Sequence, residues 1–451
     1  MNTLNRSGAR AAVLMLGLLA MGGCGLLDTQ QPNVIDPGTL NTPAAAEALR
    51  LGALADFAFV KDGDGTQVSD GLILLSGLLS DEFVHSTTPP SEQEIDQRTT
   101  ALINPNLSGV YAHLHKARAG SERAAAALQQ FLVTPEESPE IAEMQSIAGF
   151  TYVYFGEDFC SGVPFSRVSG DSLIFGTPQT TQTTFEAALA KFDSALAHPG
   201  LSQDDGTITN LALVGRARAL LDLGRFAEAA VAASAVPTDF QYVTEHAESP
   251  LQIQNAIWVY TSQGLWSVAD QEGGNGLPFI SAVDPRVPVD SVDADGDGFA
   301  DTGLDNQTPQ YILLKYPDAN ASVSVADGIE ARLIEAEAQL KAGSRSGMTT
   351  ILNNLRQNAI SPALPNLATP GTDAAATDLL FSERAFWLYA TGHRLGDMRR
   401  LIRQYLRLPD TVFPIGDYHK GGGVYGEDVN LPIPIEEQNN PNSGGCLDRN
   451  A

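Results

Sequence analysis

The sequence is poor in cysteine, in basic side chains and in long apolar runs, and each shortage excludes a class of protein. Only 3 of the 451 residues are cysteine, and no Cys/His spacing typical of a zinc site occurs. The 27 basic residues are outnumbered by 54 acidic ones, and the net charge of −27 argues against nucleic acid and anionic lipid headgroups as partners. Beyond the first residues, no apolar run is long enough to cross a bilayer.

Motifs that carry catalysis are missing as well. The chain contains no Gly-x-Ser-x-Gly nucleophile turn, no phosphate-binding loop and no histidine paired with a plausible nucleophile. Carboxylate pairs abound in so acidic a chain and therefore single out no glycosidase site. What the chain does have is an apolar fraction of 43 %, which is ample for a packed core. We therefore expect a protein that is not an enzyme and that requires no cofactor.

Residues 1–23 have the composition of a secretory signal. Two arginines precede the eleven-residue apolar run 11–21, which is too short for a stable membrane anchor. The run ends in Leu-Ala-Met-Gly-Gly before Cys24, which resembles the bacterial lipobox, where the cysteine is acylated and becomes the mature N-terminus. An ordinary signal peptide with an incidental cysteine is the alternative.

The segment after the signal indicates a lipid-anchored protein. We predict that Cys24 carries fatty acyl groups such as palmitate and that residues 24–41, rich in Pro, Asn, Thr and Gly, form a tether. No acidic residue follows Cys24 directly, because the first one is Asp28, and this favours the outer membrane over retention at the inner membrane.

Two cysteines remain, Cys160 and Cys446. In an oxidising compartment, two such cysteines favour a disulfide. This bridge would fasten the C-terminal tail to the body of the protein. Two free, buried thiols are the alternative.

Apolar residues recur at helical spacing over most of the chain, which predicts a helical scaffold over about 42–160, 184–236 and 326–406. The clearest hairpin is 210–236, where a Gly-Arg-Phe turn separates two alanine-rich amphipathic halves, as in tetratricopeptide repeats. The expected fold class is therefore mainly α: an α-α superhelix with tetratricopeptide-like helical hairpins.

Binding residues concentrate on loops. We therefore expect a long loop-rich ligand and partner face with short strands, formed by three irregular spans at about 160–182, 237–325 and 407–450. Ile257 to Tyr260 reads as one such strand. Exposed rings stack on sugar faces. The ligand-binding candidates are therefore the aromatic residues Trp258, Tyr260, Trp266 and Tyr418. Packing of these rings in a minor core is the alternative.

The segment 293–301 reads Asp-Ala-Asp-Gly-Asp-Gly-Phe-Ala-Asp. Aspartates at alternate positions, a glycine turn and a further aspartate are the layout of a calcium-binding loop. The candidate ligands are the carboxylates of Asp293, Asp295, Asp297 and Asp301 and the carbonyl of Phe299. The twelfth position is Leu304, so the loop is not a complete EF-hand. Calcium here would be structural, and a solvated acidic turn is the alternative.

The segment Ala385 to Ala390 is densely apolar and must be buried. Charged residues flank it on both sides. An unpaired buried ion is costly. We therefore predict a structural charge network made by Glu383, Arg384, Arg394 and Asp397. A catalytic Glu/His/Asp cluster is the alternative.

This stretch resembles the helix-turn-helix signature of the SusD/RagB family of outer-membrane nutrient-binding lipoproteins. The family pattern begins with Glu-Arg, which stands here at 383–384 and is followed by a hydrophobic run. Its Gly-His-Arg and Asp-Leu-Arg-Arg parts correspond to 392–394 and 397–400. Two acidic positions that the family often carries are Trp387 and Thr391 here. Similar weak matches at 155–165, 284–286, 330–337 and 431–434 extend the resemblance over nearly all the mature chain, so that 42–451 is expected to be a single SusD-like domain.

The resemblance implies a non-enzymatic lipoprotein of the outer membrane, exposed at the cell surface. It would bind an oligosaccharide or a peptide and deliver it to a TonB-dependent, SusC-like receptor. Two other hypotheses stay open. A tetratricopeptide-type scaffold that binds proteins in the periplasm would have a groove lined by helix faces and no ligand-binding rings in 237–325. A secreted hydrolase would have a buried acid pair in a cleft.

Overall fold

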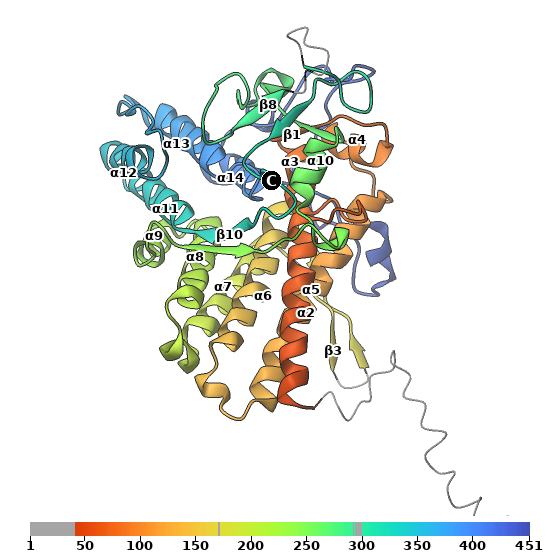
Figure 1. Cartoon of the computed structure of the whole chain (residues 1–451), viewed down its shortest axis with the longest axis vertical. Helices are drawn as coiled ribbons and strands as arrows, with labels where there is room; N and C mark the ends of the chain where they lie inside the picture. Colours follow the sequence, from red (N-terminus) through yellow and green to blue (C-terminus); the bar gives the residue numbers. More distant parts are fainter. Residues whose placement is uncertain (1–40, 170–171, 292, 294–299) are drawn as a thin grey trace, which may run out of the picture.

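The computed structural model describes residues 41–169, 172–291, 293 and 300–451, and this part of the chain is mainly helical (Figure 1). The predictions for the signal segment, for Cys24 and for nearly all of the tether fall on residues 1–40 and lie outside the described residues. No described helix is both long and apolar enough to cross a membrane.

Thirteen α-helices form the described scaffold. Their bounds are α2 Pro43–Asp62, α3 Leu72–Leu79, α4 Pro90–Asp96, α5 Pro105–Phe131, α6 Pro139–Asp158, α7 Thr181–Leu196, α8 Thr207–Asp222, α9 Phe226–Ser234, α10 Ala256–Ser262, α11 Gly328–Lys341, α12 Arg345–Asn358, α13 Asp373–Trp387 and α14 Arg394–Tyr405.

Capping residues set the starts of the two helices at the edge of the bundle. The Thr42 side chain accepts a hydrogen bond from the backbone N–H of Ala45 at 3.2 Å, and a proline follows as the first residue of α2. The Asn104 side chain accepts from the N–H groups of Asn106 and Leu107 at 3.0 and 3.1 Å, and α5 also begins with proline. These starts are therefore encoded locally.

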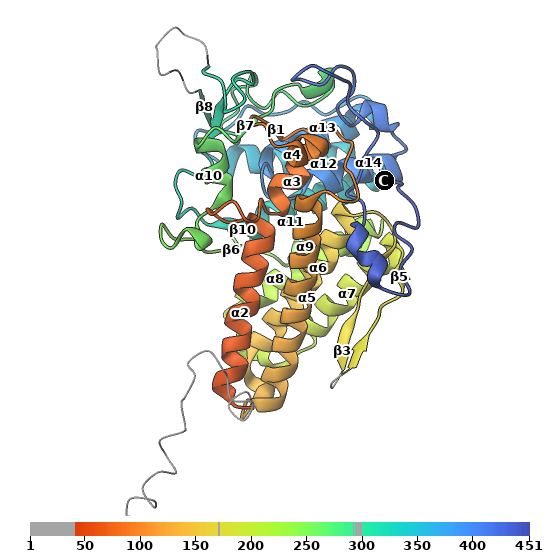
Figure 2. The same ribbon diagram turned by 90° about the vertical axis from the view of Figure 1, so that its right-hand side faces the viewer.

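The helices pack in succession, each against the next. Helix α2 contacts α5, α5 contacts α6, and the series continues through α7, α8, α9, α11 and α12 (Figures 1 and 2). Helices α8 and α9 are the hairpin predicted over 210–236, and they turn at Gly224, whose φ of +73° suits a residue without a Cβ. The α-α superhelix with tetratricopeptide-like hairpins is confirmed.

The strands are short and occur in antiparallel pairs. The pairs are β1 (Phe83–His85) with β7 (Trp266–Val268), β6 (Gln241–Thr244) with β10 (Val323–Asp327), β2 (Val163–Pro164) with β5 (Pro178–Gln179), β3 (Arg167–Ser169) with β4 (Ser172–Ile174), and β8 (Val289–Ser291) with β9 (Tyr311–Leu313).

The strand expected at Ile257 to Tyr260 is wrong, because these residues lie in helix α10. The Asn255 side chain accepts a hydrogen bond from the backbone N–H of Trp258 at 3.1 Å and so caps the helix. A short apolar run fits either a strand or a buried helix, and here the cap decides.

The irregular spans are distributed over two ends of the molecule. Strand β3 lies beside the helical bundle, whereas β8 lies at the opposite end (Figures 1 and 2). The C-terminal span contacts both of the others: the Asn440 amide donates to the carbonyl of Gly176 at 3.2 Å, and the Lys420 ammonium lies 2.9 Å from the Asp305 carboxylate. The C-terminal span therefore connects the other two.

Candidate functional site

The aromatic residues predicted to bind ligand are mostly inside the protein. Trp266 is fully buried and packs edge-on against Tyr260 with ring centroids 5.3 Å apart. The Tyr260 hydroxyl donates to Asp70, and the Tyr418 hydroxyl donates to Asp96 at 2.6 Å. Both tyrosines are buried. For these three rings the stacking role is corrected to core packing, because their faces are covered by other side chains.

Trp258 differs from the other three rings, because it is only partly buried and packs against the edge of the main core. Its placement on α10 follows from the cap at Asn255 described above. The ring therefore stays a candidate for ligand contact.

The predicted charge network is present and buried. Asp397 accepts from Arg384 at 2.8 and 3.0 Å and from Arg400 at 2.6 Å. Burial alone would raise the pKa of Asp397, but the charges of the two arginines outweigh it and hold this pKa well below its usual range. Arg394 pairs with Asp81 at 2.5 Å, a partner that lies more than 300 residues away in sequence.

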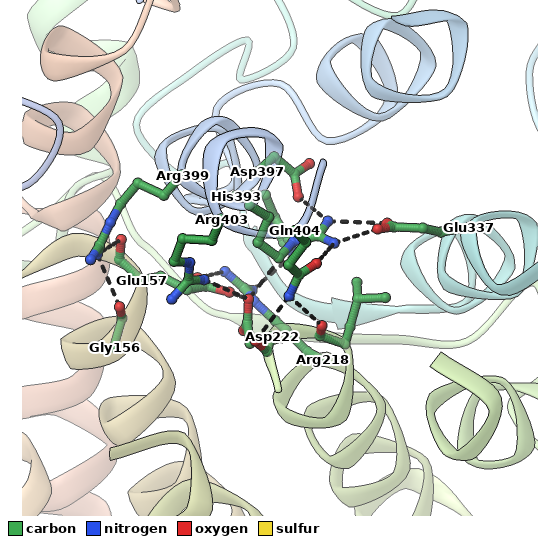
Figure 3. A network of polar contacts seen from close by, with 12 residues as sticks. Gly156, Glu157, Arg218, Asp222, Glu337, His393, Asp397, Arg399, Arg403 and Gln404 are labelled. Atoms are coloured by element: carbon green, nitrogen blue, oxygen red, sulfur yellow. Dashed lines mark hydrogen bonds and ion pairs between the residues drawn. The ribbon is translucent and has the colours of Figure 1, made fainter. Parts of the chain in front are cut away.

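Glu383 completes the predicted set through two arginines from other elements. It lies 2.8 Å from Arg286 and 2.6 Å from Arg356. A second part of the network centres on Arg218 of α8, which donates to Glu157 at 2.7 Å (Figure 3). These groups satisfy one another across five helices and the segment before β8. Mutual pairing of this kind is what a structural network of buried charges requires.

The two remaining cysteines form a disulfide, as predicted. Cys160 and Cys446 are joined with a Cα–Cα distance of 5.8 Å. The bridge connects the segment that follows α6 to the C-terminal tail, five residues from the chain end.

The predicted calcium loop lies between β8 and β9, and three of its candidate ligands, Asp295, Asp297 and Phe299, fall outside the described residues. Within the described ranges, no cluster of three or more metal-binding side chains occurs. The calcium site stays a prediction.

A buried acid pair lies at the loop-rich end. Asp96 is fully buried and accepts from Tyr418 at 2.6 Å and from His419 at 2.8 Å. Glu272, which is 5 % exposed, accepts from Tyr425 at 2.8 Å. Burial, reinforced by the charge of Asp96, raises the pKa of Glu272 well above its usual range. Protein atoms therefore cover both carboxyl groups.

An open cavity lies instead on the outer side of α5, and we call it the α5 groove. Its volume is about 460 Å³, which falls within the range of small-ligand sites. One wall is the face of α5 that carries Tyr111, His115 and Arg118. The other walls are the segment after β2, with Pro164, and the C-terminal segment, with Pro434.

Sequence reasoning missed the α5 groove. Tyr111, His115 and Arg118 are spaced by four and three residues, which places them on one helix face. That spacing was a usable signal. The opposite walls come from residues about 50 and 320 positions further along the chain, and no local pattern brings them to α5.

A second cavity, of about 430 Å³, lies between the end of α2 and strand β6. Its walls are mainly apolar, with Phe57, Phe59 and Tyr242. The histidine that lines it, His246, lies 3.2 Å from Asp62, which also forms a 2.6 Å pair with Lys61.

SusD superfamily proteins are among the solved structures that share this architecture. One from Bacteroides thetaiotaomicron aligns with a TM-score of 0.66 over 90 % of this chain and 100 % of its own length, at 14 % sequence identity. One from Bacteroides fragilis aligns with the same score over 89 % of this chain and 99 % of its own, also at 14 % identity. The chain has the SusD fold.

A further structure with the SusD fold is the surface glycan-binding protein A from Bacteroides uniformis. It aligns with a TM-score of 0.66 at 13 % identity and covers 90 % of this chain and 99 % of its own. No family model matches the sequence, and neither does any curated protein. The sequence motifs at 383–400 thus belong to a chain whose backbone follows the SusD fold along about nine-tenths of its length.

Proposed function

We propose that this chain is a non-enzymatic cell-surface lipoprotein of the outer membrane that binds a nutrient and delivers it to a TonB-dependent, SusC-like receptor. The observation that carries the proposal is the SusD fold over about 90 % of the chain, shared with proteins described as surface glycan-binding proteins. The nutrient is therefore an oligosaccharide in the first place, with a peptide as the second class.

Lipid anchoring is supported by the order of the N-terminal features. The predicted acylation site, Cys24, is the first of the 18 tether residues 24–41. The tether is followed by the capping Thr42 and by Pro43, where α2 begins. A segment of that length reaches at most about 60 Å when extended. The tether therefore allows the helical body to stay close to the membrane surface while it contacts a receptor.

The anchoring and the partnership can be tested with one tagged strain. The full-length protein, with an affinity tag after Ala451, is purified in mild detergent from the native membrane and its N-terminal peptide is examined by mass spectrometry. We expect an acylated Cys24 and co-purification of a TonB-dependent barrel. The matched Cys24→Ser variant should remain unprocessed and unacylated and should no longer reach the cell surface. A mature chain with a free, unmodified N-terminus, or one isolated without any barrel, would contradict the proposal.

The binding role is tested separately with purified protein. Oligosaccharide and peptide panels are screened by calorimetry, and each mixture is then analysed for products by mass spectrometry. We expect binding of one class without turnover. Consumption of a glycan by the protein alone would favour the hydrolase hypothesis instead.

A further inference from the structure

The segment 416–426 reads Gly-Asp-Tyr-His-Lys-Gly-Gly-Gly-Val-Tyr-Gly, and we call it the Gly-rich loop. Its two arms face each other in an antiparallel bridge between Asp417 and Val424. The residues at its tip, 421–424, are exposed, whereas its two tyrosines, Tyr418 and Tyr425, are only 2 % and 7 % exposed. The two rings pack edge-on with centroids 5.4 Å apart. Two aromatic side chains therefore fasten this loop to the body of the protein.

Both tyrosine hydroxyls end on the buried acid pair. The Tyr418 hydroxyl donates to Oδ2 of Asp96, the last residue of α4, at 2.6 Å. The Tyr425 hydroxyl donates to Oε1 of Glu272 at 2.8 Å. The residue between the loop tip and Tyr418, His419, places its Nε2 at 2.8 Å from the same Oδ2 of Asp96. Three side chains of the Gly-rich loop therefore depend on these two carboxyl groups.

Each acid of the pair has a second oxygen without a hydrogen-bond partner in the described structure. These oxygens are Oδ1 of Asp96 and Oε2 of Glu272, and both are buried. Burial, reinforced by the charge of Asp96 and by direct contact with its side chain, raises the pKa of Glu272 well above its usual range. One proton between the two carboxyl groups satisfies both free oxygens, because one group then donates and the other accepts.

The hydrogen bonds place this proton on Glu272. Oδ2 of Asp96 accepts from the backbone N–H of His85 at 3.0 Å and from the Tyr418 hydroxyl, and it also faces His419. Glu272 accepts from Tyr425 alone within the described residues. Donors stabilise the ionised form of a carboxyl group. Asp96 is therefore the carboxylate, and Glu272 is the neutral acid that donates to it.

The surroundings of Glu272 offer no paired cation in the part of the chain that the structure describes. Asp81, just before β1, adds a further negative charge. Arg98 interacts with the charge of Glu272 at longer range, but its guanidinium donates to two backbone carbonyls. The hydroxyl of Tyr389 donates to the carbonyl of Glu82. An ionised Glu272 would therefore be a second buried carboxylate beside Asp96, and such an arrangement is costly.

The tip of the Gly-rich loop has contacts that do not involve the acid pair. The Lys420 ammonium lies 2.9 Å from Asp305, and it donates to the carbonyl of Thr87 at 2.7 Å and to Nδ1 of His85 at 3.0 Å. Burial, with the charge of Lys420 acting in the same direction, lowers the pKa of His85 to about 4. The His85 ring is therefore neutral at and above pH 6, so any change of the loop in that range starts at the acid pair.

We propose that the Gly-rich loop is a pH-sensitive flap, which one proton shared between Asp96 and Glu272 holds on the body of the protein. When this proton leaves to solvent at alkaline pH, the two adjacent carboxylates repel each other and move the acceptors of Tyr418 and Tyr425 apart. Opening brings both rings to the surface of the loop-rich end. The flap goes beyond the proposed function, because it concerns the conformation of the body whatever the protein binds.

The sign of the pH dependence follows from the raised pKa of Glu272. The closed flap keeps a proton that a solvated glutamic acid releases at its usual pKa. The closed state is therefore fully stabilised at low pH and loses this stabilisation as the pH rises through the pKa of the pair.

The test is hydrogen exchange of the full-length protein in detergent between pH 6 and pH 10, read by mass spectrometry of peptides that cover 416–426. The amide of Gly426 donates to the carbonyl of Gln97 in the body at 2.8 Å, so its protection reports whether the loop is attached. After correction for the intrinsic exchange rate, the protection in the wild type should fall about tenfold for each pH unit above the pKa of the pair.

Two variants replace the shared proton by amide hydrogens that do not titrate. Glu272→Gln can donate to Asp96 and still accept from Tyr425, and Asp96→Asn can donate to Glu272 and still accept from Tyr418. In both variants the protection of the Gly426 amide should stay constant over the same pH range. Either variant decides the question, and circular dichroism at pH 6 shows which of them is folded.

The matched control is Glu427→Gln, the same chemical change at an exposed residue directly after the loop. It should keep the wild-type pH profile. Other buried acids titrate alike in all four proteins, so the difference between the curves isolates the acid pair. A wild-type profile as flat as that of the amide variants would overturn the proposal. Release of the loop in the amide variants in parallel with the wild type, or loss of the pH dependence in Glu427→Gln, would overturn it too.

Discussion

Nη1 of Arg218 lies 2.8 Å from Nε2 of His393 in the interior of the charge network (Figure 3). Arginine only donates, so Nε2 of the imidazole accepts in this contact and the ring proton sits on Nδ1. The Glu330 carboxylate lies 3.2 Å from the same Nε2 and is the group that would favour a proton there. Nδ1 in turn lies 2.8 Å from the Thr391 hydroxyl, which can receive that proton as an acceptor. Burial, with the charge of Arg218 acting in the same direction, lowers the pKa of His393 well below its usual range.

We predict that His393 stays neutral, with its proton on Nδ1, from pH 8 down to pH 5. Long-range ¹H–¹⁵N correlation spectra of protein with labelled histidine measure this directly, because the two ring nitrogens have different shifts in each tautomer. His393→Asn identifies the signal by its loss. A ring protonated on both nitrogens at pH 6 would show that the Arg218 contact is not formed.

Removal of the charge on Asp397 should destabilise the fold strongly. Asp397→Asn leaves Arg384 and Arg400 with an amide in place of a buried carboxylate, and breaking a buried pair in this way costs about 3–5 kcal/mol. Urea unfolding followed by circular dichroism measures the change in the free energy of unfolding.

The matched control for that substitution is Asp373→Asn at the surface. Asp373 pairs with Arg345 at 3.1 Å, but its side chain is 77 % exposed, so its loss should cost no more than about 1 kcal/mol. Equal effects of the two substitutions would mean that the network around Asp397 contributes no more than an ordinary surface pair.

The parts of the fold that were predictable from sequence are those that depend on near neighbours. Thr42 followed by proline marks the start of α2, and the Gly224 turn marks the α8–α9 hairpin. The existence of a charge network also followed from local composition, because Glu383 and Asp397 flank an apolar run that has to be buried. The identity of the partners did not follow from local composition, because Arg394 pairs with Asp81, which lies 313 positions away in the sequence.

The ligand-binding rings show where the sequence argument failed. An aromatic residue in an irregular span can face solvent or complete the core, and composition does not distinguish the two. Trp266 is buried because β7 pairs with β1, and its partner His85 lies 181 positions away, so no local pattern indicates the contact. The α5 groove was missed for the same reason, because the prolines that face the helix come from distant segments.

The buried acid Glu82 should make stability fall as pH rises through neutrality. Its Oε1 accepts from the backbone N–H of Ala390 at 2.9 Å, and burial raises its pKa from 4.5 to about 8. The folded state therefore holds a proton that the unfolded state has released above pH 4.5. The contribution of this group is fully present below that pH and is lost as the pH approaches 8.

The test for Glu82 compares the wild type with Glu82→Gln, which cannot ionise and keeps an acceptor for Ala390. Between pH 5 and pH 8 the wild type should lose about 3 kcal/mol more free energy of unfolding than the variant. Urea unfolding at four pH values gives both curves. Parallel curves would show that Glu82 is already ionised in the folded protein.

Loss of the disulfide should destabilise the whole fold and leave the C-terminal tail partly in place. The Cys160→Ser, Cys446→Ser double variant removes a link between residues 286 positions apart, and a bridge of this kind is worth about 2–5 kcal/mol, mostly through the unfolded state. Backbone hydrogen bonds from Cys160 to Leu431 at 2.9 Å and from Leu447 to Ser161 at 2.7 Å remain to hold the tail.

Urea unfolding measures the global loss in the double variant, and hydrogen exchange of the Leu447 amide measures the local one. Wild-type protein treated with a reductant under native conditions should behave as the double variant does. An unchanged unfolding midpoint in the variant would show that the bridge contributes nothing beyond the contacts that already hold the tail.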